Sequence, residues 1–201
     1  GNIHPVLLST LPFGLDGKVK WSQANPSEIG LENMKVTVGK LAAEFNAGFN
    51  FENDPLIHTL TVDIDRMCLA DLLEIIPDNY KKEFEGLDTD LSMKLGLRLD
   101  KHYRPLTDSI PSVSIDVKAD AGRLRMGQLY LTELSLDGSA VIAGDSLDAS
   151  TIDIRRLKAS GRSVDVDLST TVARPLSNPR LKGRFEGNVN LGSLPASLMD
   201  K

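Results

Sequence analysis

The residues of this chain that could take part in catalysis include one serine motif. The segment from Gly144 to Leu147 reads Gly-Asp-Ser-Leu, which matches the nucleophile block of hydrolases that use a Ser/His/Asp triad. Such an enzyme needs a histidine near its C-terminus to accept the serine proton, but no histidine follows His102 here. Gly, Asp and Ser are also ordinary turn residues, so we interpret the motif as a turn between strands.

Two pairs of aspartates have a spacing that could hold a hard cation. Asp63 and Asp65 lie two residues apart, as do Asp165 and Asp167. Calcium takes about six to eight oxygen ligands that converge from a loop, whereas two carboxylates along one strand supply too few. We therefore expect these aspartates on a solvated strand face, and the sequence predicts no metal site.

The single cysteine, Cys68, cannot form an internal disulfide, and the three widely spaced histidines make no zinc cluster with it. Its neighbours are apolar, which favours a small buried hydrophobic role over a reactive thiol. His58 is expected on a strand surface. We predict a non-enzyme without a cofactor; a deep pocket lined by His58, Asp63 and Arg66 would instead favour an enzyme.

The elements that would carry these residues are mostly strands. From Leu91 to Asp100, apolar residues occupy every odd position and polar residues or glycine every even one, which is the pattern of a strand with one dry face. The alternation returns, complete or partial, at 36–38, 45–51, 60–64, 113–119, 129–131, 134–137, 152–154, 164–169, 181–185 and 189–191. This spacing predicts about ten to twelve strands in a meandering antiparallel sheet.

The alternation breaks in two places, at 67–86 and at the C-terminus. Leu69, Leu72, Leu73 and Ile76 follow the i, i+3, i+4, i+7 pattern of an amphipathic helix that ends before Pro77. A short helical turn is expected at 80–85, and another short helix at 193–199. The fold class that follows is mainly β (α+β): a large curled antiparallel sheet or β-groove with two or three short helices.

Composition excludes several classes of protein. The 201 residues are 41% hydrophobic, 25% charged and 5% aromatic, with a net charge of −5. These values are those of a folded domain rather than a disordered chain. Scattered basic residues and few aromatics argue against nucleic-acid binding. No run reaches the roughly 18 apolar residues that a membrane-spanning helix needs.

The strand-to-helix segments at 57–86 and 181–201 resemble each other, which predicts an internal repeat of about 125 residues. We expect residues 1–201 to form one β-rich segment. The chain begins with Gly rather than Met, so we also expect it to be excised from a longer protein.

Several phrases of the sequence resemble AsmA-like proteins. The strand-to-helix run 60–77, the Gly-x-Val-x-Leu phrase within 187–194, and the Leu-x-Gly-x-Val strands at 15–19 and 136–141 carry the resemblance. It implies a periplasmic protein whose parent is anchored in the inner membrane by an N-terminal helix absent from this chain. It further implies a part in outer-membrane biogenesis and in lipid transport along an apolar β-groove.

A sheet of about ten alternating strands has one apolar face that must be covered by a second sheet, by helices or by a non-protein ligand. In the groove interpretation, that face binds phospholipid acyl chains. The predicted groove residues are Leu91, Met93, Leu95, Leu97, Leu99, Val113, Ile115, Val117, Val164, Val166 and Leu168. The alternative is a closed β-sandwich that acts as a protein-interaction or adhesion module of the cell envelope; protein partners are not predicted.

Overall fold

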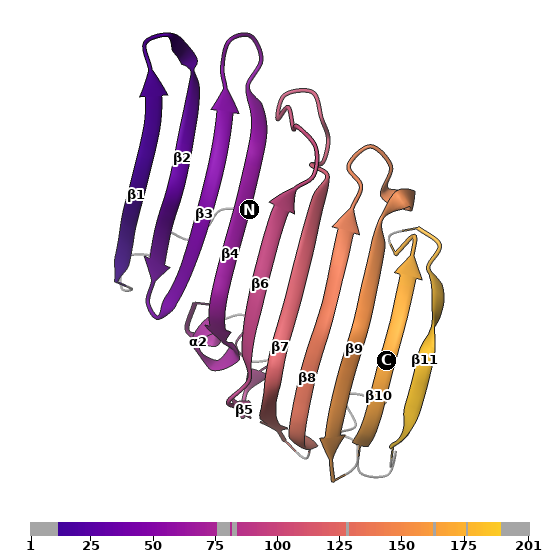
Figure 1. Cartoon of the computed structure of the whole chain (residues 1–201). Coiled ribbons are helices and arrows are strands. Elements are labelled where there is room, and N and C mark those ends of the chain that lie inside the picture. The colour runs from indigo at the N-terminus through magenta and orange to yellow at the C-terminus, as the bar shows by residue number, and fades with distance from the viewer. Residues whose placement is uncertain are drawn as a thin grey trace.

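The computed structural model describes residues 12–75, 81, 84–127, 129–162, 164–175 and 177–189. Eleven strands form one antiparallel sheet, as the sequence predicts, and Figure 1 shows the long strands side by side in a single layer. The strands are β1 (Phe13–Ser22), β2 (Asn25–Val38), β3 (Leu41–Asn50), β4 (Leu56–Cys68), β5 (Asp88–Thr89), β6 (Ser92–Leu99), β7 (Val113–Met126), β8 (Leu129–Ile142), β9 (Thr151–Gly161), β10 (Val164–Ala173) and β11 (Arg180–Val189).

The order of strands in the sheet is the order of strands in the chain. The path runs β1-β2-β3-β4-β6-β7-β8-β9-β10-β11, and every pair of neighbouring strands along it is antiparallel. The short strand β5 lies off this path and pairs with β7. Each long strand therefore takes its hydrogen-bonding partners from its neighbours along the chain.

Helix α2 (Leu69–Ile75) confirms the expected amphipathic helix, although Cys68 is the last residue of β4 rather than part of the helix. A 3-10 turn at Leu147–Ala149 precedes β9. The expected turn at 80–85 and the C-terminal helix at 193–199 lie wholly or largely outside the described residues. The second half of the expected repeat lies partly there too, so the repeat stays a prediction.

Bulges keep the apolar residues of the longer strands on one side of the sheet. In β8, the apolar positions change from odd to even between Leu131 and Leu134, and the pairing with β9 shifts at the same place. Likewise β2 changes parity between Leu31 and Met34, where its register with β3 shifts. An extra residue in one strand reverses which side later residues face. The sequence-based separation of 129–131 from 134–137 was therefore wrong: both belong to β8.

A further bulge joins β5 to β6. Leu91, between the two strands, is buried. A Cβ on Gly122 would lie 2.8 Å from the Leu91 Cα, so the absence of a side chain at Gly122 lets the Leu91 backbone lie this close to β7. The Asp90 carboxylate accepts a hydrogen bond from Nε of Arg123 at 2.9 Å and another from the Arg123 backbone N–H. The backbone hydrogen bond, followed by that of the guanidinium, lowers the pKa of Asp90.

Very little of this sheet forms a core. Among the described residues, the buried hydrophobic side chains are Met34, Ala47, Leu91, Ala119 and Leu131. Two of these five are alanines, and no second sheet packs on the first within the described part of the chain. The closed sandwich expected as an alternative is therefore not formed by these strands.

Candidate functional site

The Gly-Asp-Ser-Leu segment is a structural turn, as its composition suggested. The Ser146 carbonyl accepts a hydrogen bond from the Ala149 backbone N–H at 2.8 Å, which closes the 3-10 turn, and Asp145 forms an ion pair with Lys101. His102 and Asp145 line a shared hollow, but Ser146 is not among its lining residues. Ser146 and His102 therefore do not meet in this hollow.

The paired aspartates lie exposed on the charged side of the sheet. Asp63 flanks Gly96, where the Asp63 carboxylate would lie 3.6 Å from an added Cβ. Asp165 accepts a hydrogen bond from the Ser160 hydroxyl at 2.9 Å, and Asp167 lies 3.6 Å from Arg156. Nowhere in the described part of the chain do three or more potential metal ligands gather.

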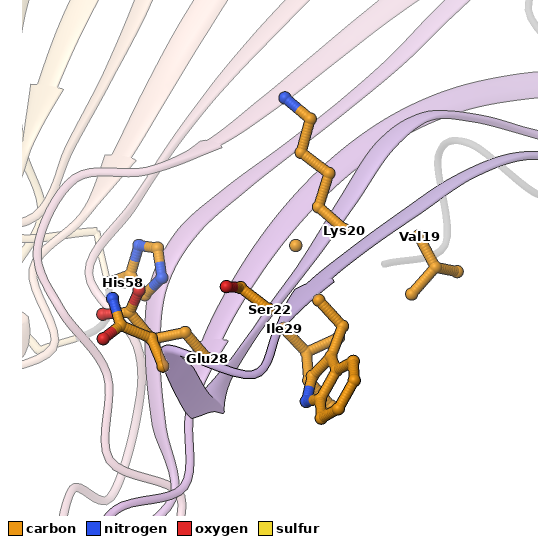
Figure 2. Close-up of a pocket in the computed structure, with 9 residues that line it drawn as sticks. Val19, Lys20, Ser22, Glu28, Ile29 and His58 are labelled. Atoms are coloured by element: carbon orange, nitrogen blue, oxygen red, sulfur yellow. The ribbon is translucent and has the colours of Figure 1, made fainter.

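A shallow hollow near one end of β1 and β2 brings together several polar side chains (Figure 2). Lys20, Ser22, Glu28 and His58 contribute to it, and Figure 2 shows the side chains of Lys20 and Val19 extending in different directions. Gly30 also lines it. A neighbouring hollow shares Gly30 and His58 and includes Gly48, where an added Cβ would lie 2.2 Å from the His58 ring.

This hollow does not provide the pocket that would favour an enzyme. His58 is exposed, as expected; its Nδ1 lies 3.2 Å from the Thr59 hydroxyl, and its ring centroid lies 6.5 Å from that of His102. Asp63 lines a separate hollow beside Gly96. Since His58 and Asp63 do not share a cavity, no acid-base pair forms between them.

The largest continuous feature of the described chain is the apolar face, which we define as the side of the sheet that carries Leu97. A row of apolar residues crosses nine strands through directly paired positions. The row consists of Met34, Phe45, Val62, Leu97, Ile115, Ala140, Ile152, Val172 and Leu181. No polar residue interrupts it between β2 and β11.

A second row crosses seven strands on the same face. It consists of Met67, Met93, Ala119, Leu136, Leu157, Leu168 and Phe185. The row between the two is less regular, because Gly138 and Thr170 occur in it. Two apolar rows on either side of a less bulky row make a band that runs from β4 to β11.

The predicted groove residues have different places in this band. Those on β6 and β7 lie opposite one another, as in the pairs Leu95 with Val117 and Leu99 with Val113. Those on β10 share the face but are separated from them by β8 and β9. Leu91 is the exception: it lies before β6 at the buried bulge. The two predicted groups are therefore parts of one open face and do not pack against each other.

Sequence reasoning omitted the residues at the two ends of this face. On β1, Phe13, Val19 and Trp21 are 63%, 66% and 58% exposed, and on β11 Leu181 and Phe185 are 71% and 61% exposed. The alternation of β1 and β11 carried this information, because their large apolar residues also occupy every second position.

The opposite, polar face carries the charges, and several of them form ion pairs. Arg155 contacts Asp137 through Nε at 2.7 Å, and Lys158 contacts Glu133 at 2.7 Å. These pairs connect neighbouring strands and remain partly open to solvent. The sheet is thus strongly two-sided, with charged groups on one face and uncovered apolar groups on the other.

The dimensions of the apolar face suit an extended hydrocarbon chain. Along β6, Met93 to Leu99 spans about 20 Å at the usual strand rise, and ten strands place the outermost pair about 43 Å apart. One leaflet of a bilayer has a hydrocarbon depth of about 15 Å. An acyl chain of that length is shorter than the apolar side of β6 and can lie along the strand.

The fold and face define a class of protein: an open antiparallel meander with one uncovered apolar face. Comparison with protein-family models, with curated proteins and with solved structures finds no match to this chain. Among the described residues, none of the helices has both the length and the hydropathy to cross a bilayer.

Proposed function

We propose that the chain is a non-enzymatic lipid-binding segment that holds phospholipid acyl chains on its apolar face. The observation that carries the proposal is the nine-strand row of directly paired apolar residues, with no covering sheet among the described residues. Such a face in water is costly at about 25 cal/mol per Å² of exposed apolar area, and an acyl chain removes this area from water without needing hydrogen bonds from the protein.

The composition of the face supports a lipid over a protein ligand. Its central part is aliphatic, as in Leu95, Leu97, Ile115 and Val117, whereas interfaces between proteins are enriched in aromatic residues and arginine. Aliphatic side chains contact a flexible hydrocarbon without imposing a specific shape. The face therefore suits acyl chains of varied length.

The resemblance of the sequence to AsmA-like proteins extends the proposal to the cell. We place the segment in the periplasm, within a parent protein anchored in the inner membrane, and assign it to lipid movement in outer-membrane biogenesis. Phospholipid acyl chains are the proposed partner, and neither a cofactor nor nucleic acid is required.

Two matched substitutions test the binding face. Val117 on β7 lies on the apolar face, whereas Val141 on β8 faces the polar side, where it pairs with Ser114. Val117→Asp places a carboxylate where acyl chains would lie, and Val141→Asp makes the same chemical change on the other side. The readout is uptake of a fluorescent phospholipid from phosphatidylcholine vesicles, and circular dichroism confirms that both variants keep their strands.

We expect Val117→Asp to reduce uptake at least tenfold and Val141→Asp to leave it within twofold. Native mass spectrometry of gently purified protein should also detect bound phospholipid. Protein that is reproducibly lipid-free and takes up no fluorescent lipid would overturn the proposal, as would equal loss of uptake in the two variants.

A further inference from the structure

The two outer strands of the sheet differ in how regular they are. The pairing of β1 with β2 has register shifts between Asp16 and Lys18 and between Trp21 and Ser22. In contrast, β11 pairs with β10 through ten consecutive residues without a shift. No described strand pairs with the outer edge of β11. A regular edge of this length is a template for another strand, because its outward backbone groups form a continuous series.

The side chains of β11 alternate in a way that suits pairing with a second β11. On the apolar side, Gly183 and Gly187 stand on either side of Phe185, which is 61% exposed. On the polar side, Arg184 and Glu186 flank the same residue and form an ion pair with each other. The charges are therefore arranged symmetrically, with opposite signs, about Phe185.

A two-fold axis normal to the sheet beside Phe185 would make two β11 strands antiparallel and keep both apolar faces on the same side. In this register Phe185 lies opposite its copy, and Arg184 lies opposite Glu186 of the other chain, twice. Opposite charges placed across neighbouring strands attract, and aromatic residues pair favourably there. No like-charged residues face each other among these positions.

The other way to join copies, β11 to β1, has the opposite electrostatics. With the two ten-residue strands fully overlapped and their apolar residues on one side, Lys182 lies opposite Lys20 and Arg184 lies opposite Lys18. The third charged pair, Glu186 and Asp16, is also of like sign. Like charges directly opposite each other on neighbouring strands are destabilising, so this arrangement is disfavoured in the register of fullest overlap.

We infer that β11 is a homodimerisation edge, at which a second copy of this chain adds its own β11 in antiparallel orientation about Phe185. The dimer joins two sheets into one and continues the apolar face from copy to copy. This inference concerns the edge of the sheet and does not depend on what the apolar face binds.

Disulfide trapping tests the register. In a Cys68→Ser background, Phe185→Cys places two thiols at directly opposite positions, whose Cα atoms are about 4.5 to 5.5 Å apart in antiparallel strands. Disulfides form across such separations. We expect a cross-linked dimer on a non-reducing gel after mild oxidation. Leu181→Cys on the same strand and Val19→Cys on β1 are comparably exposed, yet neither lies opposite its own copy, so both should remain uncrosslinked.

Charge reversal tests the energetics. Arg184→Glu places a glutamate opposite Glu186 of the other copy at both symmetric positions, and it should weaken dimerisation at least tenfold by sedimentation equilibrium. The exchange Arg184→Glu with Glu186→Arg should restore it, and Lys18→Glu on β1 should leave it unchanged. A chain that stays monomeric at about 100 µM would overturn the inference. Equal cross-linking at positions 181 and 185, or failure of the exchange to restore the dimer, would overturn it as well.

Discussion

The two faces of the sheet differ in how their side chains are partnered within the chain. On the polar face, charged side chains such as Arg155 and Lys158 find partners on neighbouring strands of the same chain. On the apolar face, residues such as Leu97 and Val172 pair with apolar residues of the neighbouring strands and remain partly exposed. The polar face presents charged groups to water, whereas the apolar face leaves aliphatic side chains uncovered, and the following predictions sharpen this difference.

The largest expected effect separates a buried leucine from a half-exposed one on the same face. Leu131 is 6% exposed, whereas Leu97 lies half-buried at the centre of the nine-strand row. Truncation of a buried leucine to alanine costs about 2 to 5 kcal/mol, because transfer and cavity terms add. We expect Leu131→Ala to fall in this range and Leu97→Ala to cost about 1 kcal/mol, as measured by urea unfolding of lipid-free protein. Equal costs would indicate that the face is a closed core.

A second pair compares glycines on the two faces. A Cβ at Gly161, which pairs with Leu131, would lie 2.2 Å from the backbone carbonyl oxygen of Tyr130. At Gly48 the near atom belongs instead to the exposed His58 ring, which can rotate away. We expect Gly161→Ala to cost about 1 to 3 kcal/mol, the range for overpacking, and Gly48→Ala to cost less than about 1 kcal/mol. Thermal unfolding of the two variants measures the difference, and a reversed order would contradict it.

A smaller effect is expected from the ion pairs. Arg155 is 45% exposed and reaches both Asp137 and Asp116. Partly exposed pairs contribute about 0.2 to 1 kcal/mol and are screened by salt. Arg155→Gln should therefore reduce the free energy of unfolding by about 0.5 kcal/mol in low salt, and the difference should shrink in 1 M NaCl. A loss that is insensitive to salt would point to packing instead.

The smallest expected effect is a pH dependence at the β5–β6 bulge. The hydrogen bonds of Arg123 lower the pKa of Asp90, so the folded state favours the ionised carboxyl. The resulting stability is present above the ordinary aspartate pKa and is lost as pH falls through the lowered value. Asp90→Asn should flatten this part of the stability profile below about pH 4. Identical acid profiles for the two proteins would show that the bulge does not depend on this charge.

The sequence predicted the strands well because alternation is a local property. The alternation from Leu91 to Asp100 predicts which residues share a face, and β6 has its apolar residues on one face as predicted, apart from Leu91, which lies before the strand. Bulges were less apparent, although the change of parity between Leu131 and Leu134 is the trace that a bulge leaves in the sequence.

The open form of the sheet could not be predicted in this way. An open sheet and a closed sandwich both need one apolar face per strand, so the alternation of residues around Leu97 and Val166 is the same in either fold. Strand order is what separates the two folds, because β6 and β10 lie in one sheet with β7, β8 and β9 between them. For the same reason, the contribution of Leu136 and Leu157 to the apolar band became evident only from the pairing.

The sequential strand order also has a consequence for how the chain folds. Because each long strand pairs with the strands next to it along the chain, every hairpin can form without waiting for a distant segment. Loop closure is then inexpensive in entropy, and folding can start at any hairpin and spread outward in both directions. The molecule should therefore tolerate removal of a terminal hairpin far better than removal of a central one, because a terminal hairpin pairs with the rest of the sheet on one side only.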